Sequence, residues 1–102
     1  MKRVSSVSAD VIIYTTDYCP YCVRAKGLLT KKQVPFKEVK VDTREDLRSW
    51  LMSASGQRTV PQIFINGEPV GGFTELADLD RKGVLDRKLA EAPADGAKAL
   101  PA

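Results

Sequence analysis

Two cysteines three positions apart, Cys19 and Cys22, are the residues of this sequence best suited to chemistry. The spacing lets the two thiols form and break a disulfide with each other. Cys19 is predicted to lie at the N-terminus of a helix that begins at Pro20. That position favours the reactive thiolate, because unpaired backbone N–H groups and the positive end of the helix dipole attract an anion. We therefore predict a redox-active dithiol in which Cys19 attacks a disulfide and Cys22 resolves the mixed disulfide that forms.

Other interpretations of the pair stay open at this point. The two thiols could be structural and buried together by chance, or they could be half of a metal site completed by a second chain. The chain of 102 residues contains no histidine and only these two cysteines. It therefore cannot build a Ser-His-Asp triad, a Cys-His pair or a four-cysteine zinc site. We expect no metal site and no tightly bound cofactor in a monomer.

The composition of the chain limits the kinds of partner it can bind and indicates where in the cell it acts. The chain has 16 Lys+Arg against 13 Asp+Glu, a net charge of +3, and its basic residues are scattered instead of forming a patch. We therefore expect no nucleic-acid partner. No apolar stretch approaches the ~20 residues that span a bilayer, so we expect no membrane association. The N-terminus has no apolar secretory core, which predicts a cytoplasmic protein, where disulfides are usually transient and catalytic.

The elements on either side of the cysteines can be predicted from local pattern. Residues Val11–Thr15 are mostly β-branched and apolar, which indicates a buried strand that ends just before the motif. Pro20 suits the first position of a helix, so Cys19 is predicted to be the N-cap. An apolar face runs along this helix to about Thr30.

A second strand and helix follow. Residues Phe36–Val41 alternate apolar and charged side chains, as in a half-buried strand near the edge of a sheet. Asp42 and Glu45 have the spacing of a capping box, with Asp42 as the predicted N-cap of the next helix. The apolar residues of that helix are spaced three or four apart, and the helix is predicted to stop at Ser55-Gly56.

The last third of the chain predicts a hairpin and a final helical region. Asn66-Gly67 is a strong turn signal between the strands Ile63–Ile65 and Glu68–Gly71, the second of which is an edge strand because it contains a proline. Thr74 is the predicted N-cap of a helical region that breaks at Gly83 and continues to Leu89.

The predicted order is therefore β-α-β-α-β-β-α. This order indicates an α/β domain over residues 11–89, with a four-stranded mixed β-sheet flanked by helices. A helix between the first two strands favours a parallel pair, and the Asn-Gly turn adds an antiparallel hairpin. We predict a flexible lead-in over residues 1–10 and a flexible tail over residues 90–102, where large apolar residues are scarce.

Three sequence motifs together resemble the dithiol glutaredoxins. The motifs are Tyr14-Thr15 before Cys19-Pro20-Tyr21-Cys22, Arg58-Thr59-Val60-Pro61 and Val70-Gly71-Gly72-Phe73. They occur in the family's order and spacing, and the likeness runs from about Val11 to Leu89. The resemblance implies a thioredoxin fold and a glutathione-dependent thiol-disulfide oxidoreductase. Its partners would be glutathione, as co-substrate, and disulfide-bearing or glutathionylated proteins.

The resemblance also implies a set of glutathione-binding residues. Pro61 would follow a cis peptide bond that turns the backbone of Val60 toward the thiols, where it can pair with a peptide-like substrate. Gly72 would allow close approach, and the N–H groups of Phe73 and Thr74 would bind the γ-glutamyl carboxylate. The whole implied set is Tyr21, Thr59, Val60, Pro61, Gly72, Phe73 and Thr74.

The sequence departs from the family pattern shortly before the motif. Glutaredoxins usually have a lysine there that helps to hold the glycyl carboxylate, whereas this chain has Thr16. Arg58 is the nearest basic residue that could compensate. Three rival functions stay open. They are a redoxin reduced directly by a thioredoxin-reductase-type flavoenzyme, a glutathione-ligated iron–sulfur carrier that bridges two subunits, and a binding adaptor whose CxxC pair is idle.

Overall fold

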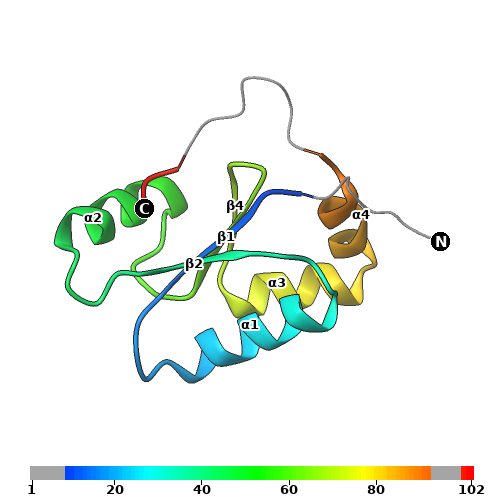
Figure 1. Ribbon diagram of the computed structural model, residues 1–102, viewed down its shortest axis with the longest axis horizontal. Helices are drawn as coiled ribbons and strands as arrows, with labels where there is room; N and C mark the ends of the chain where they lie inside the picture. The colour runs from blue at the N-terminus through cyan, green and yellow to red at the C-terminus, as the bar shows by residue number, and fades with distance from the viewer. Residues whose placement is uncertain (1–8, 93–99) are drawn as a thin grey trace.

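The computed structural model describes residues 9–92 and 100–102. Within this part of the chain there are four strands and four helices (Figure 1). Their bounds are β1 Val11–Thr15, α1 Pro20–Lys31, β2 Lys37–Lys40, α2 Glu45–Ser55, β3 Gln62–Ile65, β4 Glu68–Gly71, α3 Phe73–Arg81 and α4 Val84–Ala90. The order matches the prediction, with the last helical region divided into α3 and α4.

The four strands form one mixed sheet in the order β2-β1-β3-β4. Strand β1 is central and runs parallel to β2, with Thr15 opposite Lys40, while β3 is antiparallel to both β1 and β4. The predicted edge positions of β2 and β4 are confirmed. The loop that carries Cys19 therefore follows a strand that is hydrogen-bonded on both sides.

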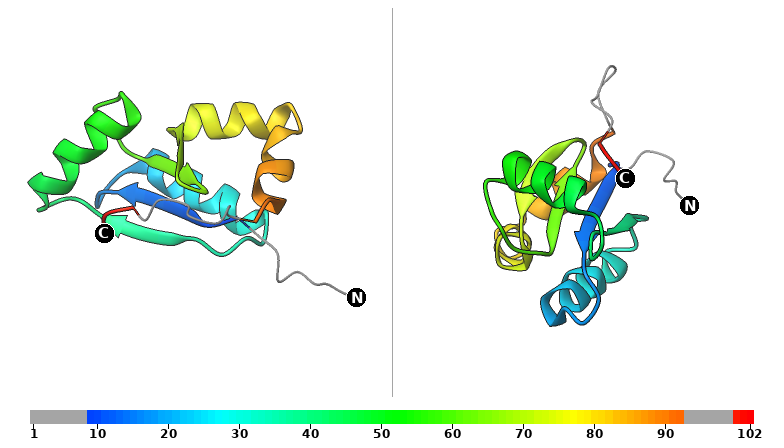
Figure 2. Two further views of the ribbon diagram at one scale, coloured as in Figure 1. Left: turned by 90° about the horizontal axis from the view of Figure 1, so that it is seen from above. Right: turned by 90° about the vertical axis from the view of Figure 1, so that its left-hand side faces the viewer.

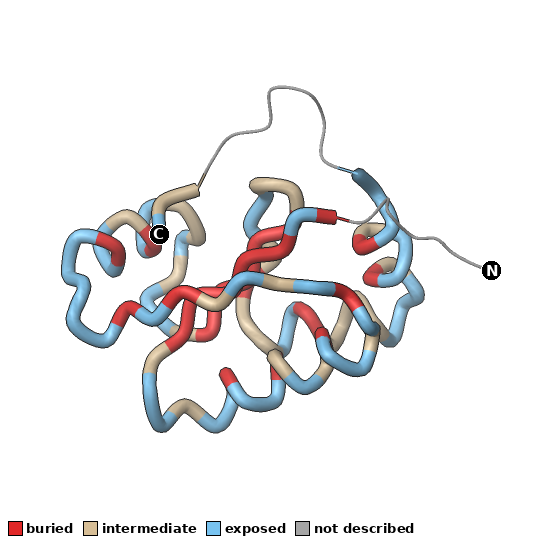
Figure 3. Tube along the Cα trace, viewed as in Figure 1, coloured by how far each residue is buried: buried red, intermediate tan, exposed pale blue. Residues whose placement is uncertain are grey.

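Helices cover the two faces of the sheet unequally. Alternating residues of β1 point to opposite faces, so Ile13 packs with α1, α3 and α4, whereas Ile12 and Tyr14 pack with α2. The two further views show α2 apart from the other helices (Figure 2). Buried residues follow the crossing strands through the middle of the molecule (Figure 3). Helix α1, whose N-terminal end carries the cysteines, therefore packs directly on the sheet through Ala25 and Leu29.

The predicted turns and breaks are confirmed by the backbone angles. Asn66 and Gly67 have φ values of 53° and 83°, as a tight hairpin turn between β3 and β4 requires. Gly56, at φ 74°, ends α2, and Gly83, at φ 75°, separates α3 from α4.

Of the three predicted N-caps, Cys19 is confirmed, whereas Asp42 and Thr74 are wrong. Helix α2 begins at Glu45 with Arg44 as N-cap, and the carboxylate of Asp42 instead accepts the N–H of Asp17 at 2.7 Å. Asp42 therefore ties down the loop before Cys19, a tertiary contact that replaces the local one. Helix α3 begins at Phe73 rather than after Thr74, with Gly72 at the N-cap.

The N-terminal lead-in is anchored where the structure describes it. Ala9 is buried and its N–H donates to the carbonyl of Leu89 at 2.9 Å, while the N–H of Asp10 donates to the side chain of Asn66 at 2.8 Å. These two residues of the predicted lead-in are therefore held by hydrogen bonds to the domain. Residues 1–8 lie outside the described part of the chain.

The extreme C-terminus also packs on the domain, next to α2 (Figure 1). Leu100 contacts the core cluster on the α2 face of the sheet, and the carbonyl of Pro101 accepts a hydrogen bond from the Tyr14 hydroxyl at 2.6 Å. A buried hydroxyl needs such a partner, because leaving it unpaired is costly. Leu100 and Pro101, which belong to the predicted tail, therefore contact the domain, while residues 93–99 lie outside the described residues.

Substitution of Leu100 tests this C-terminal contact. We expect Leu100→Asp to lower the free energy of unfolding by about 1–2 kcal/mol, because a charge would replace a half-buried apolar side chain. Equilibrium denaturation in urea measures the change. Ala102→Asp is the matched control, since Ala102 is exposed and the same charge there should have little effect. Equal stability of the two variants would contradict the contact.

Candidate active site

Cys19 lies at the N-cap of α1, as predicted. Its sulfur accepts a hydrogen bond from the N–H of Cys22 at 3.1 Å, and its thiol donates to the carbonyl of Val60 at 3.8 Å. The side chain is partly exposed, and both cysteines are free thiols. The sulfur is thus held against helix N–H groups that stabilise negative charge, while a substrate can still reach it.

Cys22 occupies a different environment one helical turn further on. It is only 2% exposed, and burial raises the pKa of its thiol from the ordinary 9.0 to about 12. The hydrogen bond with Cys19 and the charge of that residue also raise the pKa of Cys22, while a backbone hydrogen bond from Thr16 and the charge of Lys26 lower it. The buried thiol is therefore protonated at neutral pH, as suits a group that acts second.

A groove with a volume of about 410 Å³ lies between Tyr21, the Val60–Pro61 loop and the start of α3, and Val60 connects it to the Cys19 thiol. The Val60–Pro61 peptide bond in its wall is cis. Across the groove the rings of Tyr21 and Phe73 are 6.2 Å apart between centroids. We call it the α3 groove and define it by the residues that line it: Tyr21, Gln57, Thr59, Val60, Pro61, Gly72, Phe73, Thr74 and Glu75.

Backbone groups dominate the far end of the α3 groove. The N–H of Gly72 donates to the carboxylate of Glu75 at 2.6 Å, and a Cβ at Gly72 would lie 3.3 Å from the carbonyl of Pro61. The following N–H groups, of Phe73 and Thr74, belong to the first turn of α3 and have no partner within a helix. An anion can therefore bind at this end of the groove.

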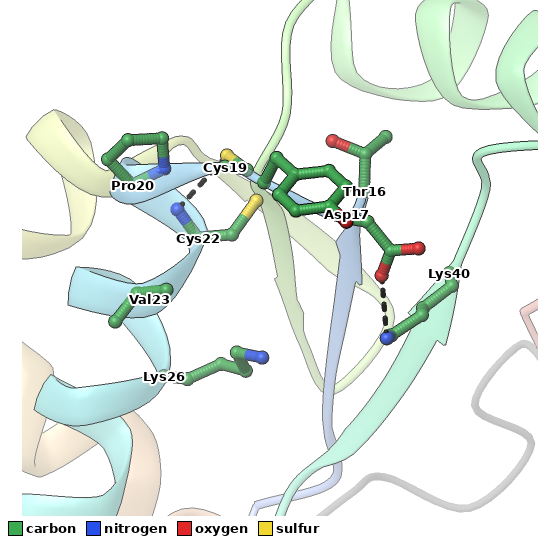
Figure 4. A pocket seen from close by; sticks show the side chains of 9 residues that line it. Thr16, Asp17, Cys19, Pro20, Cys22, Val23, Lys26 and Lys40 are labelled. Carbon is green, nitrogen blue, oxygen red and sulfur yellow. Dashed lines mark hydrogen bonds and ion pairs between the residues drawn. The ribbon is translucent and has the colours of Figure 1, made fainter.

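A second hollow lies on the other side of the cysteines, between α1 and β2 (Figure 4). It has a volume of about 440 Å³. Two ion pairs flank it, Lys26 with Glu38 at 2.9 Å and Lys40 with Asp17 at 2.8 Å. We call it the β2 hollow, and the residues that line it are Thr16, Asp17, Tyr18, Cys19, Pro20, Cys22, Val23, Lys26 and Lys40.

The structure brings the predicted glutathione-binding residues together in one groove, with the exception of Arg58. The seven residues implied as a glutathione site all line the α3 groove. Arg58 lines a separate small depression with Arg48, and its role in binding stays a prediction. Thr16 lines the β2 hollow on the other side of the cysteines.

Sequence reasoning missed residues in both pockets. Gln57 and Glu75 line the α3 groove, and Lys26 and Lys40 line the β2 hollow. Lys26 was detectable, because it lies four residues after Cys22 and so on the same face of the helix. Lys40 was not, because only the parallel register of β1 and β2 brings it near the thiols.

Gly71 offers a test of the backbone that supports the α3 groove. Its φ of +116° is unfavourable for other residues, and a Cβ there would lie 2.8 Å from a Glu75 carboxylate oxygen. We expect Gly71→Ala to lower the free energy of unfolding by about 1–3 kcal/mol.

The control for this substitution is Gly27→Ala within α1. A Cβ at Gly27 meets nothing within 4 Å, and alanine favours the helix, so we expect a gain of up to ~1 kcal/mol. Thermal and urea unfolding of the two variants measures both changes. A Gly71→Ala variant as stable as the wild type would show that the backbone tolerates the side chain.

Two further features concern the described residues only. No group of three or more His, Cys, Asp or Glu side chains among them is placed to hold a metal ion. Among the same residues, none of the helices is both long and apolar enough to cross a membrane.

A central β-strand, a thiol at a helix N-cap, a second thiol buried one turn later and a cis-proline loop beside them define a thiol-disulfide oxidoreductase of the thioredoxin fold. Residues 11–70 match the family model described as Glutaredoxin. The chain belongs to the glutaredoxin family.

Curated relatives and solved structures agree with this assignment. A glutaredoxin of Pseudomonas aeruginosa is 49% identical over 79 residues, covering 78% of this chain and 94% of the relative. Glutaredoxin 3 of Escherichia coli K12 is 47% identical over 78 residues, covering 76% and 94%. A solution structure of a Brucella melitensis glutaredoxin superposes with a TM-score of 0.76 at 44% identity, covering 83% and 92%. The crystal structure of a buckwheat glutaredoxin–glutathione complex has a TM-score of 0.75 at 30% identity, covering 82% and 83%.

Proposed function

We propose that this protein is a glutathione-dependent thiol-disulfide oxidoreductase that reduces protein disulfides and protein–glutathione mixed disulfides. The observation that carries the proposal is the meeting of the α3 groove and the reactive thiol at one residue. Val60 lines the groove, and its carbonyl lies 3.8 Å from the sulfur of Cys19. A tripeptide in the groove would thus have its own thiol beside Cys19.

The charges of the α3 groove match those of glutathione. The first-turn N–H groups of Phe73 and Thr74 would bind the γ-glutamyl carboxylate. The Glu75 carboxylate beside them is the acceptor available for the neighbouring ammonium group. The backbone of Val60 would pair with the cysteinyl residue of the tripeptide as an added strand does. The complex of the related buckwheat protein with glutathione supports this assignment.

The chemistry proceeds in three exchanges. Cys19 thiolate attacks the disulfide of a substrate, forms a bond to one sulfur and releases the other as a thiol after it takes a proton. Cys22 or a glutathione thiolate then attacks the mixed disulfide on Cys19. Two glutathione molecules finally return the Cys19–Cys22 disulfide to the dithiol, and they leave joined as glutathione disulfide. Both thiols and the groove belong to one chain, so we propose that the protein acts as a monomer. We also propose that it acts in the cytoplasm, where glutathione keeps thiols reduced.

A comparison of electron donors tests the proposal. The protein should reduce a glutathionylated peptide when supplied with glutathione, glutathione reductase and NADPH. It should not do so when supplied with thioredoxin reductase and NADPH alone. Efficient turnover with the second system and none with the first would assign it to the flavoenzyme-reduced redoxins instead. A visible absorbance band after anaerobic reconstitution with iron and sulfide would support the cluster-carrier alternative.

A further inference from the structure

The β2 hollow contains a charged residue that the proposed function does not use. Lys26 extends from α1 into this hollow, on the same side of the helix as Cys22 (Figure 4). Lys26 lies four positions after Cys22, so the two side chains leave the same face of the helix one turn apart. Burial is the largest influence on the pKa of Cys22 and raises it, and the charge of Lys26 acts in the opposite direction as the smallest of the influences named.

Lys26 is held in place by two residues from neighbouring strands. Its ammonium donates to the Glu38 carboxylate on β2 at 2.9 Å, and the same oxygen accepts the hydroxyl of Thr15 on β1 at 2.7 Å. Thr15 is fully buried, while the side chains of Lys26 and Glu38 are 32% and 26% exposed. Burial raises the pKa of Glu38, but the bonds from Thr15 and Lys26, together with the charges of Lys26 and Lys40, outweigh it and lower the pKa overall. Glu38 is therefore ionised at neutral pH and anchors the ammonium.

We propose that Lys26, positioned by Glu38 and Thr15, stabilises the Cys22 thiolate while that thiolate attacks the mixed disulfide on Cys19. This role rests on the dithiol exchange of the proposed function. In the step, a bond forms between the sulfurs of Cys22 and Cys19, and the bond from Cys19 to the substrate sulfur breaks. The departing sulfur keeps the electron pair and takes up a proton, so that the proton lost by Cys22 is balanced. The dithiol is oxidised by two electrons and the substrate disulfide is reduced.

The contribution of Lys26 matters most in the mixed disulfide. In the dithiol, the hydrogen bond and the charge of Cys19 both raise the pKa of Cys22. Both influences disappear when Cys19 is bonded to a substrate sulfur, because the sulfur of Cys19 then has no charge and no proton to lose. Burial then opposes the Cys22 thiolate, while Lys26 and the backbone of Thr16 favour it. With no histidine in the sequence, no imidazole can serve as a base for Cys22.

The other charged groups of the hollow provide a matched control. Asp17 lies in the loop before α1 and Lys40 on β2, and the two pair with each other at 2.8 Å. Lys40 lines the same hollow as Lys26 and is also ion-paired, but it is not among the main groups that act on Cys22. Lys40 also faces Glu38 and lowers the pKa of that carboxyl, but it does so less than the bonds from Thr15 and Lys26. Lys40→Met therefore removes a charge of the same sign from the hollow and leaves the Lys26–Glu38 pair in place.

The test follows two successive thiol releases in a stopped-flow experiment. The reduced protein is mixed with 2,2′-dithiodipyridine, an uncharged disulfide whose thiopyridone product absorbs in the near ultraviolet. Attack by Cys19 gives a first phase whose rate depends on reagent concentration. Attack by Cys22 on the resulting mixed disulfide gives a second phase that does not depend on it. The assay contains no glutathione, so its result does not depend on whether glutathione is the electron donor of this protein. If Cys22 did not resolve the mixed disulfide at all, the wild-type protein would show no second phase.

The variants are expected to change the second phase in opposite directions. Lys26→Met should slow it on the order of fivefold, with the first phase unchanged, and Lys26→Arg should restore most of the rate. Glu38→Gln keeps one oxygen that can accept from Thr15 and Lys26 but removes the opposing negative charge, so it should accelerate the second phase. Lys40→Met should leave the second phase at the wild-type rate.

A purely structural ion pair would give a different pattern. Loss of either partner would then slow the second phase, so a Glu38→Gln variant as slow as Lys26→Met would overturn the proposal. An unchanged second phase in Lys26→Met would also overturn it. If Lys26→Met does not fold, Lys26→Gln and Glu38→Gln supply the same comparison. In a Cys19→Ser background, alkylation of Cys22 measured against pH should require a higher pH once Lys26 is replaced.

Discussion

Replacement of Cys19 by serine is expected to abolish thiol-disulfide exchange, with a loss of at least about a thousandfold in the glutathione-coupled assay. A serine hydroxyl at the N-cap accepts the same backbone hydrogen bond, but it is not ionised at neutral pH. The sequence has no histidine to activate it. The variant should therefore fold normally and be inactive. Circular dichroism and NADPH consumption measure the two properties, and substantial activity in Cys19→Ser would contradict the assigned nucleophile.

The matched variant, Cys22→Ser, should separate the two kinds of substrate. A glutathionylated peptide needs only Cys19 and a second glutathione, so its reduction should continue at a substantial rate. A protein disulfide needs Cys22 to release the trapped substrate, so its reduction should fall by tenfold or more. A mixed disulfide between Cys19 and the substrate should then accumulate and be visible by mass spectrometry. Equal loss on both substrates would instead show that Cys22 is needed for folding or for the first attack.

Alkylation should distinguish the two cysteines almost completely. The pKa of Cys22 is about 12, so at pH 8 only about one Cys22 in ten thousand is a thiolate. Cys19 is the partly exposed thiol of the pair. One equivalent of iodoacetamide at pH 8 should therefore modify Cys19 and leave Cys22 intact, as peptide mapping would show.

The pH dependence of Cys22 labelling follows from the raised pKa of its thiol. The folded protein favours the neutral Cys22 thiol, so its thiolate fraction should rise tenfold for each pH unit between 8 and 11. In guanidinium chloride the pKa returns toward 9.0, and Cys22 should react readily near that pH. The stability gained by burying the neutral thiol is complete below pH 9 and is lost as the pH rises from 9 toward 12. Rapid labelling of Cys22 in the folded protein at pH 8 would contradict its burial.

Much of the fold was predictable because its signals are local. Pro20 after Cys19 specified a helix start, and Asn66-Gly67 specified a tight turn, since both depend on backbone preferences of adjacent residues. The predicted N-cap at Asp42 failed for the opposite reason. Its carboxylate had two possible N–H partners, and the distant one, from Asp17, is the one that it binds.

By itself the sequence determined the dithiol, the N-cap position of Cys19 and the order of strands and helices, because CxxC spacing, proline and periodicity act within a few residues. Only the tertiary structure decided what surrounds the thiols. It buried Cys22 and raised its pKa, and it brought Val60 to Cys19. It also linked Lys26 to Glu38 across the parallel pairing of β1 and β2. Burial and long-range register depend on how distant segments pack together, and no pattern of neighbouring residues encodes them.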